Sequence, residues 1–171
     1  KSIELCKNDL ISEVVKEFPN LQGIMGYYYS INSGFNEEIG KAIRDHYKPN
    51  GPNDDCPKTY NSKILALLDK VDTITGFFLI DEEPSSSKDP FALRRAGLGV
   101  LRIILEGNFS MNLSALISKS IEIFLNNKSF SLKVDNYKIK SKIINFILER
   151  YENLIKEKKV LNFLIYSSIA I

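Results

Sequence analysis

Apolar residues recur every three to four positions along most of the chain, which is the spacing of amphipathic helices rather than of strands. The first apolar stripe begins at Ile3 and Cys6 and continues to Val14. Pro19 is expected to end it, because the residue before a proline is disfavoured in the helical conformation. The pattern therefore predicts an opening helix of about four turns, over residues 3–18.

Start and stop signals divide the rest of the chain into further helices. Gly23 and Gly26 lie three apart, so on a helix they would share a face and let another backbone approach closely. Asn36 is a favourable N-cap, and Asp89 followed by Pro90 predicts an N-cap and a first helical residue. Helices are predicted over residues 21–31, 36–47, 61–80, 90–106, 112–125 (or from 110) and 136–158.

The segments between these helices are polar, and we interpret residues 48–60 and 81–88 as loops. Residues 130–134 (FSLKV) alternate like a strand, but five residues without a partner favour an extended loop or a helix edge. A final apolar segment covers residues 160–171. Because no convincing sheet is present, the predicted fold class is all-α, with seven or eight helices.

The 171 residues carry a net charge of only +2, which by itself indicates no particular partner. The charge is divided unevenly, since residues 1–109 have a net charge of −3 and residues 110–171 one of +5. Such a basic region is usually a solvated face, and it becomes an RNA contact only where aromatic groups join it. We place a domain boundary near residue 108, between a core of residues 1–108 and an extension of residues 109–171.

The cysteines and the chain ends indicate the cellular compartment of the protein and whether the chain is a fragment. Cys6 and Cys56 show no C-x-x-C spacing, which is typical of a reduced, cytoplasmic protein. No signal peptide is visible, and no apolar run approaches the roughly 18 residues of a membrane-spanning helix. The chain lacks an initiator methionine and ends in an apolar run, which suggests a fragment of a longer protein.

His46 is the only histidine, which restricts the chemistry open to the chain. An all-α phosphohydrolase of the HD type needs a His…His-Asp…Asp set for its metal ion, but here Tyr47 follows His46. Asp69 and Asp72 would share one helix face without completing such a set, so no metal site is expected. A cysteine–histidine pair is conceivable but unsupported, and the sequence has no glycine-rich phosphate-binding motif.

Arg94 and Arg95 are adjacent, so on a helix they point about 100° apart and cannot both face one solvent surface equally. At least one of them is expected to pair with Asp69 or Asp72 in an ion-pair network between helices. Direct contact with a nucleic-acid phosphate is the alternative. The two roles can coexist, because an arginine paired with a carboxylate keeps spare donors.

Several stretches of the chain are similar to one protein family. Residues 17–29 (EFPNLQGIMGYYY), 42–49 (AIRDHYKP) and 68–106 resemble the β subunit of the bacterial heterotetrameric glycyl-tRNA synthetases. The last stretch is the most specific, since its D-K-x-D-T and S-K-D-P-F-A-L-R-R-A blocks occur in order with a loop between them. A weaker similarity at residues 146–155 (FILERYENLI) extends the resemblance to about residue 157.

The resemblance implies an α2β2 ligase that uses ATP and Mg²⁺ to attach glycine to its tRNA, with the active site on the α subunit. The β subunit of this family handles the tRNA and contains an HD-like all-α domain and a C-terminal anticodon-binding region. This chain would be the HD-like helical domain and the helical start of the region that follows. Its expected partners are the α subunit and tRNA-Gly, with no catalytic residue, cofactor or membrane contact in the chain itself.

Two groups of residues are candidates for the site. The candidates for tRNA contact, or for the ion pairs that organise it, are Lys70, Lys88, Arg94, Arg95 and Arg102. The candidates for a structural polar network are His46, Asp69, Asp72 and Asp89, and either Asp45 or the polar tip of His46 would cap the end of the helix over residues 36–47. Two alternatives stay open: an HD-type phosphohydrolase acting on a nucleotide with a metal ion, and a helical scaffold that only holds subunits together.

Overall fold

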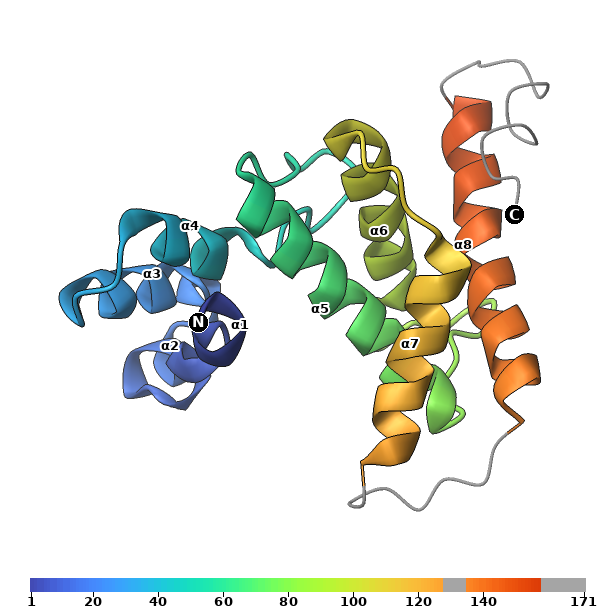
Figure 1. Cartoon of the computed structure of the whole chain (residues 1–171), viewed down its shortest axis with the longest axis horizontal. Helices are drawn as coiled ribbons and strands as arrows, with labels where there is room; N and C mark the ends of the chain where they lie inside the picture. The colour runs from blue at the N-terminus through green and yellow to red at the C-terminus, as the bar shows by residue number, and fades with distance from the viewer. Residues whose placement is uncertain (128–134, 158–171) are drawn as a thin grey trace.

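Eight α-helices make up the part of the chain that the computed structural model describes, residues 1–127 and 135–157 (Figure 1). They are α1 (Ser2–Leu5), α2 (Glu13–Glu17), α3 (Ile24–Asn32), α4 (Glu37–Asp45), α5 (Tyr60–Leu79), α6 (Leu93–Gly107), α7 (Leu113–Asn126) and α8 (Asn136–Glu157). No strand occurs within these ranges, so the predicted all-α class is confirmed. None of these helices has both the length and the apolar character needed to cross a membrane. The predictions for residues 130–134 and 160–171 lie outside the described residues.

The predicted opening helix is wrong, because α1 and α2 are separate and a short 3-10 turn (Asn8–Ile11) lies between them. The cause is Asp9, whose buried carboxylate accepts hydrogen bonds from the backbone N–H groups of Gly23 (2.6 Å) and Gly26 (3.1 Å). A buried carboxylate needs such partners, and reaching them takes the chain out of the helical path. Ser12 then caps α2 with its side-chain oxygen.

Two glycines let α3 pack closely on the end of α4, as expected. Gly23 has a φ of +79°, and a Cβ added to it would lie 2.9 Å from the carbonyl oxygen of Arg44. A Cβ added to Gly26 would lie 2.6 Å from Cγ2 of Ile43. The left-handed conformation of Gly23 also explains why α3 begins only at Ile24 rather than at residue 21.

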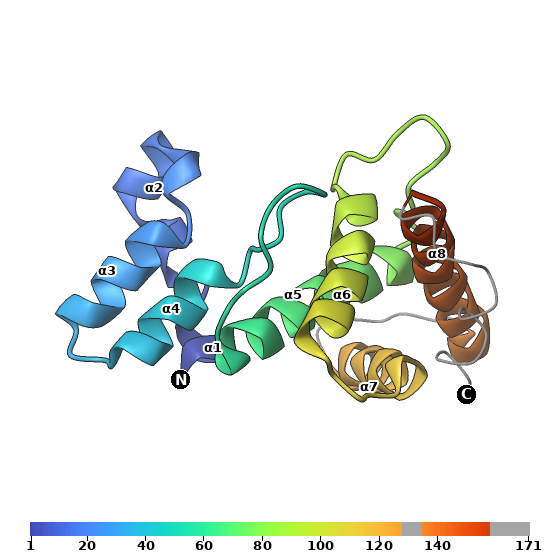
Figure 2. The same cartoon turned by 90° about the horizontal axis from the view of Figure 1, so that it is seen from above.

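Helix α5 is the centre of the structure, and α4, α6, α7 and α8 all pack against it (Figure 2). Near its beginning, Leu65 joins Ala42 and Ile43 of α4 in a small core. Farther along, α5 shares a larger core with α6, α7 and α8. Its fully buried members include Phe78, Ile103, Ile117 and Ile147. Burying each side chain of this size contributes roughly 1.5–3 kcal/mol.

The larger core contains residues from before and from after residue 108. Helices α7 and α8 follow that residue, yet they pack against α5 and α6 and against each other. In the described part of the chain these two helices therefore belong to the same packing unit as the helices before them. The domain boundary near residue 108 itself stays a prediction.

Local caps place several helix ends close to their predicted positions. Asn36 and Asn112 cap α4 and α7, since the Oδ1 of each accepts a hydrogen bond from the backbone N–H three residues on, at 3.0 and 2.9 Å. Helix α6 differs, because it begins at Leu93 rather than at Pro90. Asp89 still caps α6, although it lies four residues before the helix begins.

Replacing Gly26 with alanine should force α3 away from α4, because the new methyl group would lie 2.6 Å from the Ile43 side chain. Overpacking of this kind costs about 1–3 kcal/mol, and we expect the free energy of unfolding in urea to fall by that amount. Gly51→Ala is the matched control, since nothing lies within 4 Å of a Cβ added there. Its stability should change by less than about 0.5 kcal/mol. Equal losses in the two variants would contradict the close packing of α3 on α4.

Candidate functional site

The single histidine lies at the centre of a partly buried polar cluster where α4 ends. His46 is the C-cap residue of α4, and its side chain is fully buried. Its Nδ1–H donates a hydrogen bond to the carbonyl oxygen of Ile43 (2.6 Å), so the histidine is the one of the two expected residues that caps this helix. The ring also lies against that of Tyr47, with centroids 3.8 Å apart. Because Nδ1 carries the proton, Nε2 is left as an acceptor.

Lys7, from the segment after α1, supplies the cation of this cluster. Its Nζ donates to Nε2 of His46 (2.9 Å) and lies 2.8 Å from Oδ1 of Asp69 on α5. The same ammonium lies 4.1 Å from the centre of the Tyr47 ring, a favourable cation–π distance. We call Lys7, His46, Tyr47 and Asp69 the histidine cluster. No local motif points to Lys7, because its partners lie far along the chain.

The histidine cluster keeps His46 neutral. Burial and the Lys7 ammonium lower the pKa of His46 to about 4, from an ordinary value of 6.5. The unfolded chain takes up this proton near pH 6.5 and the folded chain only near pH 4. The contribution of His46 to stability is therefore complete above pH 6.5 and is lost as the pH falls towards 4. Close by, desolvation and the Asp69 carboxylate raise the pKa of Asp72, although much of that residue is exposed.

The geometry is that of a partly buried ion pair between Lys7 and Asp69, with the buried His46 as a further acceptor. The Nε2 of His46 and the Oδ1 of Asp69 are the donor atoms that a divalent cation would use, and both face the Lys7 ammonium. Over residues 1–127 and 135–157, no three side chains of His, Cys, Asp or Glu come together in a group that could hold a metal ion. What these atoms do chemically is to fix the N-terminal segment on α4 and α5.

Asp89 lies in a second polar group, at the start of α6. Its carboxylate accepts hydrogen bonds from the backbone N–H groups of Leu93 (2.8 Å) and Arg94 (3.0 Å), and lies 3.9 Å from the Arg94 guanidinium. Arg94 also donates to the carbonyl oxygen of Ser85. One of the two adjacent arginines thus pairs with a carboxylate, as expected, but that carboxylate is Asp89 and not Asp69 or Asp72 of α5. Arg94 pairs with Asp89, which is closer along the chain, and Asp69 pairs with Lys7.

Two of the five predicted RNA-binding residues are engaged inside the protein. Lys70 is only 7% exposed, its Nζ donates to the carbonyl oxygen of Tyr47 (2.9 Å), and burial lowers its pKa to about 8. Arg102 donates from Nη1 to three backbone carbonyls in the loop of residues 48–60, at 2.7–3.1 Å, and from Nε to Glu106. Lys70 therefore fixes the chain after α4 to α5, and Arg102 fixes the loop of residues 48–60 to α6.

Lys88 and Arg95 differ from the other basic candidates. Both are exposed, and neither side chain makes a hydrogen bond or ion pair with any part of the chain that the structure describes. They flank the start of α6 on either side of the Asp89 cap. RNA binding stays a prediction for all five residues, but these two keep their charge directed to solvent.

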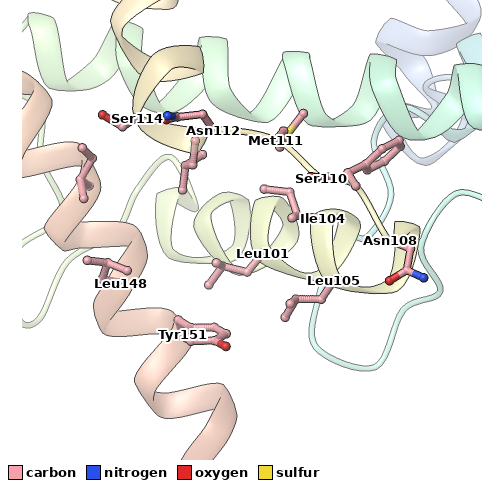
Figure 3. Close-up of a pocket in the computed structure, with 13 residues that line it drawn as sticks. Leu101, Ile104, Leu105, Asn108, Ser110, Met111, Asn112, Ser114, Leu148 and Tyr151 are labelled. Atoms are coloured by element: carbon pink, nitrogen blue, oxygen red, sulfur yellow. The ribbon is translucent and has the colours of Figure 1, made fainter. Parts of the chain in front are cut away.

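A groove of about 740 Å³ lies away from both polar groups, between α6, α8 and the segment that joins α6 to α7 (Figure 3). Leu101, Leu105, Leu148 and Tyr151 form much of its wall. Within residues 1–127 and 135–157, no carboxylate, amine, thiol or imidazole lines it, so these residues offer no group to activate its serines.

Both cysteines are free, and neither is activated as a nucleophile. Burial raises the pKa of the Cys6 thiol, and burial together with Glu106 raises that of Cys56 to about 11. The thiolate, which is the reactive form, is therefore disfavoured at neutral pH at both positions.

Replacing Lys7 with methionine should weaken the attachment of the N-terminal segment. The change leaves Nε2 of His46 without a donor and Asp69 without its counter-ion. We expect a loss of about 1–2 kcal/mol in the free energy of unfolding, measured in urea at pH 7. Lys16→Met is the control, since Lys16 pairs only with exposed Glu13 and should cost less than about 0.5 kcal/mol. Similar small losses in both variants would count against the histidine cluster as a stabilising unit.

Comparison with known proteins supports the resemblance seen in the sequence motifs. The sequence profile of the family described as "Glycyl-tRNA synthetase beta subunit" matches residues 1–170. The glycine–tRNA ligase beta subunit of Rickettsia prowazekii (strain Madrid E) is 47% identical over 147 residues, which cover 86% of this chain and 21% of the relative. That of Rickettsia typhi (strain ATCC VR-144 / Wilmington) is 52% identical over 120 residues, covering 70% of this chain and 18% of the relative. The chain thus spans about a fifth of the length of these relatives, and it belongs to the glycyl-tRNA synthetase beta subunit family.

Proposed function

We propose that this chain is a noncatalytic helical domain of a glycine–tRNA ligase, which supports tRNA-Gly binding and assembly with the α subunit. The relatives it matches are named as beta subunits of that ligase. The observation that carries the noncatalytic part is the histidine cluster. The only imidazole of the chain is buried, neutral and bonded at both nitrogens, so it is not available as an acid or base for a substrate.

The remaining parts of the proposal concern the whole enzyme. Catalysis would take place in the α subunit with ATP and Mg²⁺, in an α2β2 assembly in the cytoplasm. The phosphohydrolase alternative is less well supported, because the donor atoms that it would need for a metal ion face the ammonium of Lys7.

The proposed RNA contact is the surface at the start of α6. Lys88 and Arg95 are exposed there, and Arg94, which pairs with Asp89 and donates to the carbonyl oxygen of Ser85, keeps donors to spare. Lysine and arginine side chains of this kind bind phosphates through charge, independent of base sequence. The buried or bonded candidates Lys70 and Arg102 would then support this surface from within rather than touch the RNA.

Replacing Lys88 and Arg95 together with alanine in the full-length enzyme should weaken binding of tRNA-Gly. Each lost phosphate contact should also reduce the slope of log K against log salt by about 0.7–0.9. Filter binding or fluorescence anisotropy over a series of salt concentrations measures both quantities. Lys16→Ala is the matched control, because it also removes an exposed positive charge but lies on α2.

The double variant must keep the thermal stability of the parent enzyme for the comparison to hold. An unchanged affinity and an unchanged salt slope in a stable double variant would reject the contact at α6. An equal loss in Lys16→Ala would show a general effect of charge, and would reject it as well.

A further inference from the structure

Helix α3 has an inverted distribution of side chains. Its buried face carries small residues, Gly26 and Ser30, which lie towards α4. Its large residues Ile24, Tyr28 and Ile31 are spaced i, i+4 and i+7, so they share the opposite face. These three side chains are 39%, 59% and 37% exposed. A helix that met only water on this side would be expected to carry polar residues there.

The segment of the chain that contains α3 is also uncharged. No Asp, Glu, Lys, Arg or His occurs from residue 18 to residue 36. Helix α3 packs on α4 and α4 packs on α5, and Figure 2 shows α4 between the other two, so that α3 lies on the outside of the fold. Nine of the seventeen exposed large hydrophobic residues in the described structure fall within residues 1–31. Depletion of charge and enrichment of tyrosine are typical of the core of a protein interface.

We propose that the outer face of α3 docks on another part of the same β subunit. The chain covers only 21% of the Rickettsia prowazekii relative, so about four fifths of such a subunit lies outside it. A segment of the same polypeptide is held nearby at a high effective concentration, so that the face of one helix is enough to dock it. Two separate proteins generally need about 1,600 Å² of buried surface for a stable contact.

The uncharged, apolar character of the outer face of α3 favours a protein surface over a nucleic acid as its partner. A nucleic acid fits poorly, because phosphate binding needs lysine or arginine and the segment around α3 has neither. The matching surface should instead present apolar and aromatic side chains. The inference rests on membership of the family, and not on the RNA contacts proposed at α6, so each can fail without the other.

Thiol labelling in the full-length β subunit tests the inference. Tyr28→Cys, and Ile31→Cys as a second variant on the same stripe, would each be treated with a maleimide and followed by peptide mass spectrometry. Lys16→Cys is the control, because Lys16 is exposed in the same region but lies on a charged helix. With the β subunit alone and dilute, we expect both α3 positions to react about tenfold or more slowly than the control.

Each other outcome overturns the proposal. Labelling of both α3 positions at the rate of the control would show an open face. Protection that appears only when the α subunit or tRNA-Gly is added would identify that partner as the occupant. Protection that is lost on dilution of the β subunit would identify a second copy of the chain.

Discussion

The contact of the Lys7 ammonium with His46 and Asp69 is the interaction on which the arrangement of the N-terminal helices depends. Lys7 lies in the short segment where the first helix is interrupted, two residues before Asp9. The interruption lets both side chains point inward, so that Asp9 fixes the start of α3 and Lys7 reaches α4 and α5. The helix is broken at these residues. As a result, the side chains of Lys7 and Asp9 connect the N-terminal segment to α3, α4 and α5.

The same contact occupies the imidazole nitrogen and the carboxylate oxygen that could otherwise bind a divalent cation. A lysine is a cation that is covalently attached, and here it satisfies the imidazole and the carboxylate together. Other basic residues are used in a similar way, since Lys70 supports the end of α4 and Arg102 supports the loop of residues 48–60. The protein thus uses these three of its 23 basic residues for internal contacts, and the near-zero net charge is compatible with a small basic surface at α6.

Helices whose ends are determined by neighbouring residues could be predicted well from the sequence. Asn36 and Asn112 cap the helices that they precede, and α5 and α8 follow their apolar stripes to within a residue or two. The failures occurred where a carboxylate acts over a longer range. Asp9 binds backbone groups fourteen and seventeen residues away, and Asp89 caps α6 from four residues before its start. The role of His46 as a helix cap was predictable from its position, but its cationic partner Lys7 was not, because no local pattern records a contact across 39 residues.

Titration of His46 by NMR is the most direct test of the contact between Lys7 and His46. The chain has one histidine, so its imidazole resonances are assigned without mutagenesis. We expect a pKa near 4 for His46, with the proton on Nδ1 at neutral pH, and a rise towards 6.5 in Lys7→Met. A pKa near 6.5 in the unaltered protein, or one that does not change when Lys7 is replaced, would contradict it.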